Sequence, residues 1–306
     1  MKEYFHIPVM LTEAIDFLNI KKGGYYIDGT LGGGSYSRAI SEKIGSDGFL
    51  LSIDLDPLAV DNFLKNKPVN TEVINDNFSN LENIVHNNKL SDKLKKTKFK
   101  FDGIVVDLGL SSAQLDDESR GFSFIHDSNI DMSFGPGVEG DTSWIVNNYR
   151  LSDLERIIKE YGEEPWAKKI AEHIVFYRKR KKISSTKELA EIVAGAIPKR
   201  FWRKKIHPAT TTFQALRIET NGELDNLKKF LKVAVDLLKN DGRLVVISFH
   251  SLEDRIVKNF FRDLSRADQP EIKILTPKPL TPSELEVNTN YRSRSAKLRA
   301  IKKIKV

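Results

Sequence analysis

The chain has 306 residues, 40% hydrophobic and 30% charged, with a net charge of +7, which suits a globular protein of roughly two domains and argues against a disordered or fibrous one. No apolar run reaches the roughly 20 residues that cross a bilayer, and the N-terminus lacks a signal-peptide core, so we expect no membrane association. The absence of cysteine excludes disulfides, thiolate metal sites and a cysteine nucleophile, and is typical of a cytoplasmic protein.

Five short apolar segments predict buried strands, at 25–28, 50–54, 71–74, 103–107 and 243–248. They are almost continuously apolar, as in strands that helices cover on both faces. Helical patterns at 38–44 and 59–64 separate the first three, and this alternation predicts an α/β fold with a parallel, doubly wound sheet. Segments 272–275 and 296–304 alternate in polarity and predict a final pair of strands.

Between the fourth and fifth predicted strands the alternation stops for about 130 residues. A loop rich in Gly, Ser and Asp is followed by helical patterns. Ser152 and Ser185 each precede a glutamate by three residues, which predicts two capping boxes that open helices. Pro198 and Pro208 interrupt the helical pattern afterwards. We therefore predict an inserted helical domain at 115–212, within a discontinuous domain at 1–114 and 213–306.

Positive charge is concentrated in two segments. Residues 166–205 carry thirteen Lys and Arg against three Glu, and residues 287–306 carry seven and no acid, which leaves a net charge of −10 on the remainder. The first segment contains the run 178–182 and the cluster 199–205, which includes Trp202. Cations around exposed aromatic rings suit a nucleic acid, whose bases can stack on them. The alternative is a solvated helix face with Trp202 buried.

The first predicted strand leads into the turn Asp-Gly-Thr-Leu-Gly-Gly-Gly-Ser at residues 28–35. A glycine-rich turn between a strand and a helix lets a ligand approach the backbone and the helix N-terminus. No Gly-Lys-Ser/Thr sequence follows, so the turn is not a Walker loop. We expect a ligand at this turn, although a plain connection would also tolerate these glycines.

Carboxylates at strand ends indicate which ligand binds there. Asp28, Asp54 and Asp107 end predicted strands one, two and four, and Asp76 follows strand three. These strand ends share one crevice in a doubly wound sheet, where several carboxylates would repel a pyrophosphate. They suit S-adenosyl-L-methionine, which carries a sulfonium, an ammonium and a ribose diol. Asp54 is placed to accept from the ribose, and Phe78 to lie against the adenine or in the core.

Eight motifs follow one another along nearly the whole chain: Asp28–Gly32, Asp107–Asp116, Arg120–Phe124, Asp131-Met132, His207–Thr210, Phe213–Ile218, Phe249–Arg255 and Arg294–Arg299. Together they resemble the ribosomal RNA small subunit methyltransferase H family. The resemblance implies a class I, Rossmann-like methyltransferase with an inserted helical domain for RNA recognition. It also implies transfer of a methyl group from S-adenosyl-L-methionine to the exocyclic N4 of a decoding-region cytosine in 16S rRNA of the small ribosomal subunit. No DNA partner is expected.

The resemblance also places the cofactor contacts. They are Gly34, Ser35, Tyr36, Asp54, Phe78, Asp107 and Gln114. Three positions depart from the family pattern, which usually has Gly at 35, His at 36 and a basic residue at 211. If position 35 needs a left-handed backbone, its serine costs roughly 1 kcal/mol or more, and weaker cofactor binding follows.

Methylation of cytosine N4 requires acceptors beside the amino group, because its lone pair is delocalised into the ring, and it requires close positioning of the two reactants. Asp107 and the residues after it are the candidate acceptor site, unless the cofactor occupies Asp107. No catalytic base is assigned. His250 is a candidate, or it orders the loop that follows, and His207 is expected to cap or brace rather than react.

A paired base must leave its stack before it can be methylated. Phe122, Phe124 and Trp202 are candidate stacking surfaces, or ordinary core. The two basic segments would hold phosphates. Two other functions share part of the pattern: a nicotinamide-dependent oxidoreductase, and a non-catalytic RNA-binding or assembly protein. No metal site is predicted, because six scattered His and no Cys offer no ligand spacing.

Overall fold

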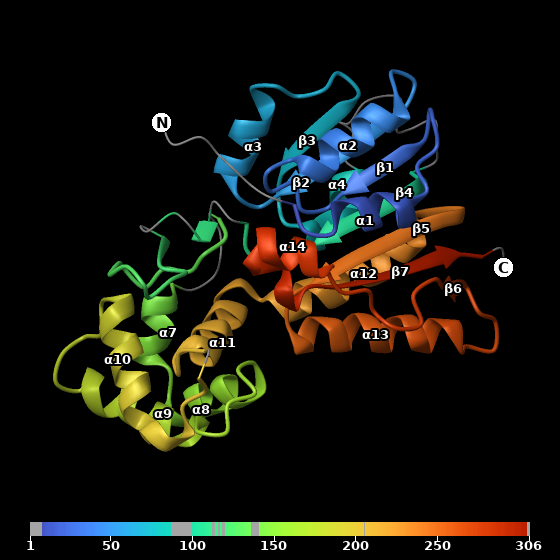
Figure 1. Cartoon of the computed structure of the whole chain (residues 1–306). Coiled ribbons are helices and arrows are strands. Elements are labelled where there is room, and N and C mark those ends of the chain that lie inside the picture. The colour runs from blue at the N-terminus through green and yellow to red at the C-terminus, as the bar shows by residue number, and fades with distance from the viewer. Residues whose placement is uncertain are drawn as a thin grey trace. The chain divides into compact units, whose positions relative to one another are not determined.

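The computed structural model describes residues 8–86, 99–111, 114–115, 117, 120–135, 141–204 and 206–304 (Figure 1). The chain forms two compact units, Met1–Ser111 with Leu224–Val306, and Ser112–Glu223. Helix α11 (Thr210–Asn221) runs through the predicted boundary at 212 and belongs to the second unit. Ser112 and Asp116 of the predicted motifs, and Lys205 of the basic cluster, lie outside the described residues.

The first unit contains a seven-stranded sheet in the order β3-β2-β1-β4-β5-β7-β6. Its strands are β1 (Tyr25–Asp28), β2 (Phe49–Asp54), β3 (Thr71–Asn75), β4 (Phe101–Asp107), β5 (Leu238–Ser248), β6 (Ile272–Ile274) and β7 (Lys297–Lys303). Neighbouring strands are parallel except for β7, which runs antiparallel to both β5 and β6. This strand order confirms the predicted doubly wound α/β fold of class I and places the ends of β1, β2 and β4 at one edge.

Helices cover both faces of this sheet (Figure 1). One core joins the sheet to α1 and α2, and includes Val105 and Val245. The other joins it to α4, α12 and α13, and includes the alternate residues Ile104 and Val246. Two buried faces explain why these strands are apolar at every position. The helices are α1 (Leu11–Leu18), α2 (Ser35–Ile44), α3 (Pro57–Leu64), η1 (Phe78–Asn80), α4 (Leu81–Val85), α12 (Glu223–Leu237), α13 (Ser251–Ser265), α14 (Glu284–Thr289) and η4 (Tyr291–Ser295).

The second unit is helical and has its own apolar core. Before α11 it contains α7 (Thr142–Asn148), α8 (Leu151–Glu160), α9 (Ala167–Arg178), α10 (Thr186–Ala196) and η3 (Lys199–Phe201). Ser185 caps α10 as predicted, because its side chain accepts from the Glu188 backbone. The predicted cap at Ser152 is wrong: α8 begins at Leu151, two residues before the predicted start, and Arg150 takes the cap position. None of the helices that the structure describes is both long and apolar enough to span a bilayer.

Candidate cofactor site

The glycine turn between β1 and α2 depends on glycine at its last position. Gly34 has a φ of 78°, in the left-handed region, and a Cβ there would lie 2.3 Å from the Phe63 ring. Ser35 is the first residue of α2 and is not among the described residues with positive φ. The strain anticipated for a serine at position 35 is therefore absent, because the left-handed residue is Gly34. The family departure at 35 is compatible with this backbone.

Asp28 supports the turn rather than facing a ligand. Its carboxylate is fully buried and accepts from the Thr30 backbone at 3.2 Å and from Ser37 Oγ at 2.6 Å. Ser37 Oγ also lies 2.7 Å from Ser52 Oγ of β2. Burial raises the pKa of Asp28 to about 7. Asp28 therefore ties the turn to α2 and β2, and the expectation that it helps to attract a positive ligand needs correction.

Asp54, at the end of β2, lies beside the turn. Its Oδ2 accepts from the Gly32 backbone at 2.7 Å and its Oδ1 from the Asp56 backbone at 2.8 Å. These two bonds fix the carboxylate in one orientation. A ribose diol would bond to these same oxygens, and the ribose contact of Asp54 stays a prediction.

Asp107, at the end of β4, carries a buried oxygen, Oδ1, with no hydrogen-bond partner among the described residues. Its backbone N–H donates to Thr30 Oγ1 at 2.7 Å, which joins the β4 end to the glycine turn. Burial, reinforced by the nearby carboxylates of Asp28, Glu253 and Glu286, raises the pKa of Asp107 well above its usual range. A buried carboxyl without a donor suits a ligand that brings positive charge or N–H groups. The site therefore fits the cationic end of S-adenosyl-L-methionine.

The remaining predicted residues of the site differ in what they contact: Phe78, Asp76 and Gln114. Phe78 begins η1, and its ring meets Phe230 edge-on at a centroid distance of 5.2 Å while remaining partly exposed. It thus belongs to the edge of the core and still offers surface to a ligand. Asp76 Oδ1 accepts from Asn77 and Asn80, so it stabilises the turn after β3. Gln114 is buried in the second unit, and its cofactor contact stays a prediction.

Tyr36 braces the segment before α1, a role that the sequence did not reveal. Its side chain is buried in the core between α1, α2 and the sheet, and its hydroxyl donates to the Val9 carbonyl. Burial, together with Asp107 and Asp28, raises the pKa of Tyr36 well above its usual range. Twenty-seven residues separate the two partners, so no local pattern signals this bond. Any cofactor contact of Tyr36 would come from its backbone.

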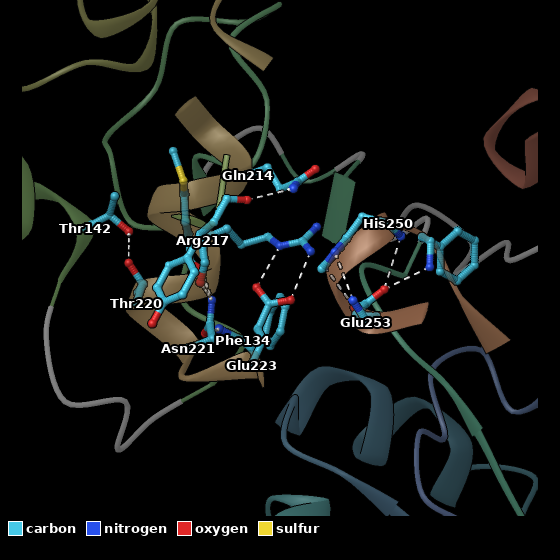
Figure 2. A network of polar contacts seen from close by, with 12 residues as sticks. Phe134, Thr142, Gln214, Arg217, Thr220, Asn221, Glu223, His250 and Glu253 are labelled. Atoms are coloured by element: carbon cyan, nitrogen blue, oxygen red, sulfur yellow. Dashed lines mark hydrogen bonds and ion pairs between the residues drawn. The ribbon is translucent and has the colours of Figure 1, made fainter. Parts of the chain in front are cut away.

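Of the two histidines singled out in the sequence, His250 caps a helix and His207 braces the start of another. His250 Nδ1 accepts from the Glu253 backbone, and Glu253 Oε2 accepts from the backbones of Phe249 and His250 (Figure 2). This capping box opens α13, so the alternative that His250 orders its loop is confirmed. His207 Nδ1 accepts from the Ala209 backbone at 3.2 Å, which braces the start of α11 as expected.

Comparison with known proteins decides between the methyltransferase and the oxidoreductase. The profile of the MraW methylase family matches residues 3–304. The chain belongs to this family. It is an S-adenosyl-L-methionine-dependent methyltransferase, which confirms the resemblance and excludes the nicotinamide alternative.

Three relatives, each named "Ribosomal RNA small subunit methyltransferase H", match over their full or nearly full length. The protein of Clostridium botulinum strain 657 is 43% identical, over 99% of this chain and 100% of its own. That of Finegoldia magna is 42% identical, over 99% of both chains. That of Caldicellulosiruptor saccharolyticus is 43% identical, over 98% of this chain and 100% of its own.

The basic C-terminal segment of this methylase is largely paired within the first unit. Lys297 and Arg299 both form ion pairs with Asp254. The Arg299 pair is buried, and its Nε lies 2.6 Å from Asp254 Oδ1. Lys302 and Lys303 pair with the acids Asp241 and Glu271. The sequence predicted that this segment binds phosphates, but that prediction considered only the number of cations and not the acidic residues with which they pair. Arg292 and Arg294 of this segment are exposed, so the phosphate-binding prediction rests on them and on the basic segment of the second unit.

Within the methylase's second unit, one arginine of the predicted basic run has a structural role. Arg178 donates to the carbonyls of Val146 and Tyr149 at 2.7 and 2.5 Å. It therefore ties the end of α9 to the end of α7. The four cations that follow are exposed, at 179–182. The surface expected to meet RNA starts after Arg178.

Of the three candidate stacking surfaces, only Trp202 is exposed. Phe124 packs edge-on against Phe213, with 4.9 Å between the ring centroids, and the rings of Phe122 and Phe134 have centroids 5.8 Å apart. Phe122 and Phe124 both pack against the core of the second unit. The core alternative is therefore supported for these two phenylalanines. Trp202 is 38% exposed.

The motif Phe213–Ile218 of the methylase lies on α11 and is used for internal contacts. Arg217 forms a two-point ion pair with Glu223 at 2.8 and 2.9 Å (Figure 2). Gln214 donates to the Tyr161 carbonyl at 3.0 Å, which joins α11 to the turn after α8. The charge of Arg217 is therefore neutralised within the second unit.

Proposed function

We propose that the protein, in the cytoplasm, transfers the methyl group of S-adenosyl-L-methionine to the exocyclic N4 of a decoding-region cytosine in 16S rRNA of the small ribosomal subunit. Membership of a methylase family supports the methyl transfer. Relatives of 42–43% identity named for small-subunit rRNA support the substrate. The observation that carries the proposal in this chain is the buried Oδ1 of Asp107 beside the glycine turn, to which no donor in the described part of the chain is bonded.

We assign the cofactor to Gly34, Ser35, Tyr36, Asp54, Phe78, Asp107 and Gln114. The turn and the first residues of α2 would contact it through backbone groups, because the Tyr36 side chain is committed to Val9. Asp54 would accept from the ribose, and Phe78 would lie against the adenine. Asp107 would lower the energy of the positive end, since its Oδ1 has no donor among the residues that the structure describes.

When bound, the cofactor supplies a methyl group attached to a sulfonium. As the bond between nitrogen and the methyl carbon forms, the bond between sulfur and that carbon breaks, and the sulfur becomes a neutral thioether. The protein must hold the cytosine amino group in line with that methyl and accept its N–H hydrogens, so that the nitrogen lone pair is localised for attack. Because Asp107 is assigned to the cofactor, the acceptors for the amino group would be backbone carbonyls of 108–110, directly after β4. The amino group loses one proton in the overall reaction, and this proton passes to water, because no catalytic base is assigned. The second unit would hold the RNA through its exposed cations at 179–182.

The decisive experiment measures transfer of a labelled methyl group to small ribosomal subunits from cells that lack this modification. Incorporation should map to a single decoding-region cytosine and should yield N4-methylcytosine on nucleoside analysis. Asp107→Asn should reduce incorporation at least tenfold, whereas Asp61→Asn, which removes an exposed acid from α3, should not. A protein that binds the cofactor but leaves that cytosine unmodified would refute the proposal.

Cofactor binding is measured separately by calorimetry. Asp54→Asn keeps one acceptor and removes the charge, so we expect roughly a tenfold weaker affinity from the loss of a charged hydrogen bond. Unchanged affinity in this variant would remove Asp54 from the ribose.

A further inference from the structure

The second unit contains a cavity of about 450 Å³, and none of its lining residues is among the assigned cofactor contacts. It opens between the turn after α8, the η3 segment and the start of α11, and every residue that lines it belongs to the second unit. Its volume is within the range of small-ligand sites, roughly 300–1,000 Å³. We call it the aromatic pocket, after its lining residues Trp166, Phe201 and Trp202.

The aromatic side chains offer flat surfaces to a ligand. Trp166 and Phe201 lie 5.1 Å apart between ring centroids, and Trp202 lies 6.4 Å from His207. The Trp202 indole donates from Nε1 to the Ile197 carbonyl at 2.9 Å, which fixes its orientation. Phe201 is nevertheless 50% exposed and Trp202 38% exposed. Oriented aromatic rings that stay exposed are the surfaces on which single-stranded bases stack.

A buried carboxylate gives the pocket its polar end. Glu164 is only 8% exposed, and it accepts from the Trp166 backbone at 3.0 Å and from Thr211 Oγ1 at 2.8 Å. It has no cationic partner among the residues that the structure describes. A carboxylate only accepts hydrogen bonds, and burial without compensation is costly, so its remaining lone pairs favour N–H donors. The amino groups of cytosine, adenine and guanine supply such donors, and uracil has no amino group.

The backbone around Glu164 is built to place it there. Glu163 has a φ of 47°, in the left-handed region that side chains rarely adopt. A Cβ on Gly162 would lie 2.8 Å from the Thr211 carbonyl, so only glycine permits this approach of the turn to α11. The turn therefore brings the carboxylate against α11 at the cost of local strain.

The charge around the pocket decides between a nucleotide and an organic cation. An aromatic site with one carboxylate would also suit an alkylammonium group. Residues 199–204, however, carry four cations and no acid, and none of the four is paired with an acid within the described chain. These cations, Lys199, Arg200, Arg203 and Lys204, are all exposed. They repel a cation and attract a phosphate.

We propose that the aromatic pocket is a second nucleotide site, which holds one unpaired nucleotide of the RNA substrate. The base stacks on the aromatic side chains and donates its exocyclic amino group to Glu164, while the cations at 199–204 contact the phosphate. The proposal relies on the proposed function only for the identity of the RNA. The pocket would set the register of the RNA on the second unit while a different nucleotide is methylated at the cofactor site.

The test titrates the full-length protein with CMP and with UMP and follows tryptophan fluorescence. The chain has three tryptophans, and two of them line the pocket, so Trp144→Phe removes the third signal without altering the pocket. We expect saturable quenching by CMP, and roughly tenfold weaker binding of UMP because it lacks the amino group. Equal affinity for the two nucleotides, or no quenching by either, would overturn the proposal.

Two variants with matched controls place the ligand. Glu164→Gln should weaken CMP binding at least tenfold, whereas Glu191→Gln, which removes an exposed charge on α10, should not. Thr211→Arg should abolish CMP binding, because the longer cation would pair with Glu164 and fill the pocket. Thr210→Arg adds the same charge at an exposed position outside the lining, and should bind CMP normally. Loss of CMP binding in the controls as well would contradict the assignment.

Methylation of small subunits separates this proposal from the proposed function. Glu164→Gln should raise the KM for subunits with little change in kcat or in cofactor affinity, since the pocket holds RNA and not the reacting groups. Normal KM in Glu164→Gln and Thr211→Arg would overturn the pocket while leaving the methyltransferase intact. A parent protein that fails to methylate subunits but binds CMP selectively would refute the function and retain the pocket.

Discussion

Replacing Gly34 by alanine tests whether the glycine turn is as tightly constrained as its geometry indicates. A left-handed backbone costs an L-residue about 1–2 kcal/mol. The new Cβ would also lie 2.3 and 2.5 Å from two Phe63 ring atoms and 2.8 Å from Arg38 Nη1. Phe63 is only 1% exposed, so its ring has little room to move, and overpacking adds about 1–3 kcal/mol. Gly34→Ala should therefore lower the free energy of unfolding by about 2–5 kcal/mol.

The assay is urea unfolding without cofactor, followed by far-UV circular dichroism, with Gly32→Ala as the matched control. Gly32 also has a positive φ, 47°, but the nearest atom to its Cβ would be the Thr30 carbonyl oxygen at 4.0 Å. The control should lose only the backbone cost of about 1–2 kcal/mol. Adding Phe63→Leu to Gly34→Ala should cost less than the sum of the two single changes, because the smaller side chain makes room. Equal losses for Gly34→Ala and Gly32→Ala would refute the reasoning.

Three further predictions concern side chains with structural roles. Tyr36→Phe leaves the Val9 carbonyl without its donor and should lower the free energy of unfolding by about 1 kcal/mol in the same urea assay. Arg178→Ala should destabilise the protein by about 1–3 kcal/mol. Arg180→Ala, which removes an exposed cation–π contact with Phe176, should cost at most about 1 kcal/mol and reduce the salt slope of RNA binding by about one, measured by filter binding. The pKa of Asp28 is about 7 in the folded protein against 3.8 for an unperturbed aspartate, so the folded state retains this proton longer and stability should fall between pH 4 and 7. That loss is at most about 4 kcal/mol, and Asp28→Asn should flatten the pH dependence of the urea midpoint; an unaltered pH dependence would contradict it.

The strands were predictable because two buried faces leave a plain apolar signal. The residues at which the strands begin and end were less predictable. The structure begins β5 at Leu238, five residues before the predicted start at 243. Lys239, Asn240 and Asp241 are polar and precede a glycine, which is typical of a turn. The pairing of β5 with β4 also shifts register between Phe101 and Gly103, and Asp241 has a positive φ, so this irregular part of the strand has the sequence pattern of a loop.

Identical local patterns gave different outcomes where the neighbouring backbone differs. Ser152 and Ser185 both precede a glutamate by three residues, yet only Ser185 is a cap. Ser185 has an extended backbone, while at Ser152 the extended residue is Arg150 and the serine already lies in the first turn. A capping residue must be extended, and side-chain identity alone does not specify which residue is.

Charge counts failed for a related reason. The sequence shows how many cations a segment carries but not which acids fold against them. Arg299 meets Asp254 from 45 residues away, and Arg178 reaches the carbonyls at the end of another helix. A count of charges alone assigns both arginines to an RNA surface. Pairing of this kind is tertiary, so only the folded chain separates structural cations from available ones.

The carboxylates at the sheet edge show the same limit at the cofactor site itself. Asp28, Asp54 and Asp107 each end a parallel strand, and nothing in the sequence distinguishes them. The chain folds donors back onto the first from Thr30 and Ser37, and onto the second from Gly32 and Asp56, but leaves Oδ1 of the third without one among the described residues. A buried acceptor without a donor is costly in the free protein and is compensated when a ligand supplies the missing interaction. Asp107 is therefore the residue at which cofactor binding should recover the most energy, and the strand end from which the acceptor for the cytosine amino group must be sought.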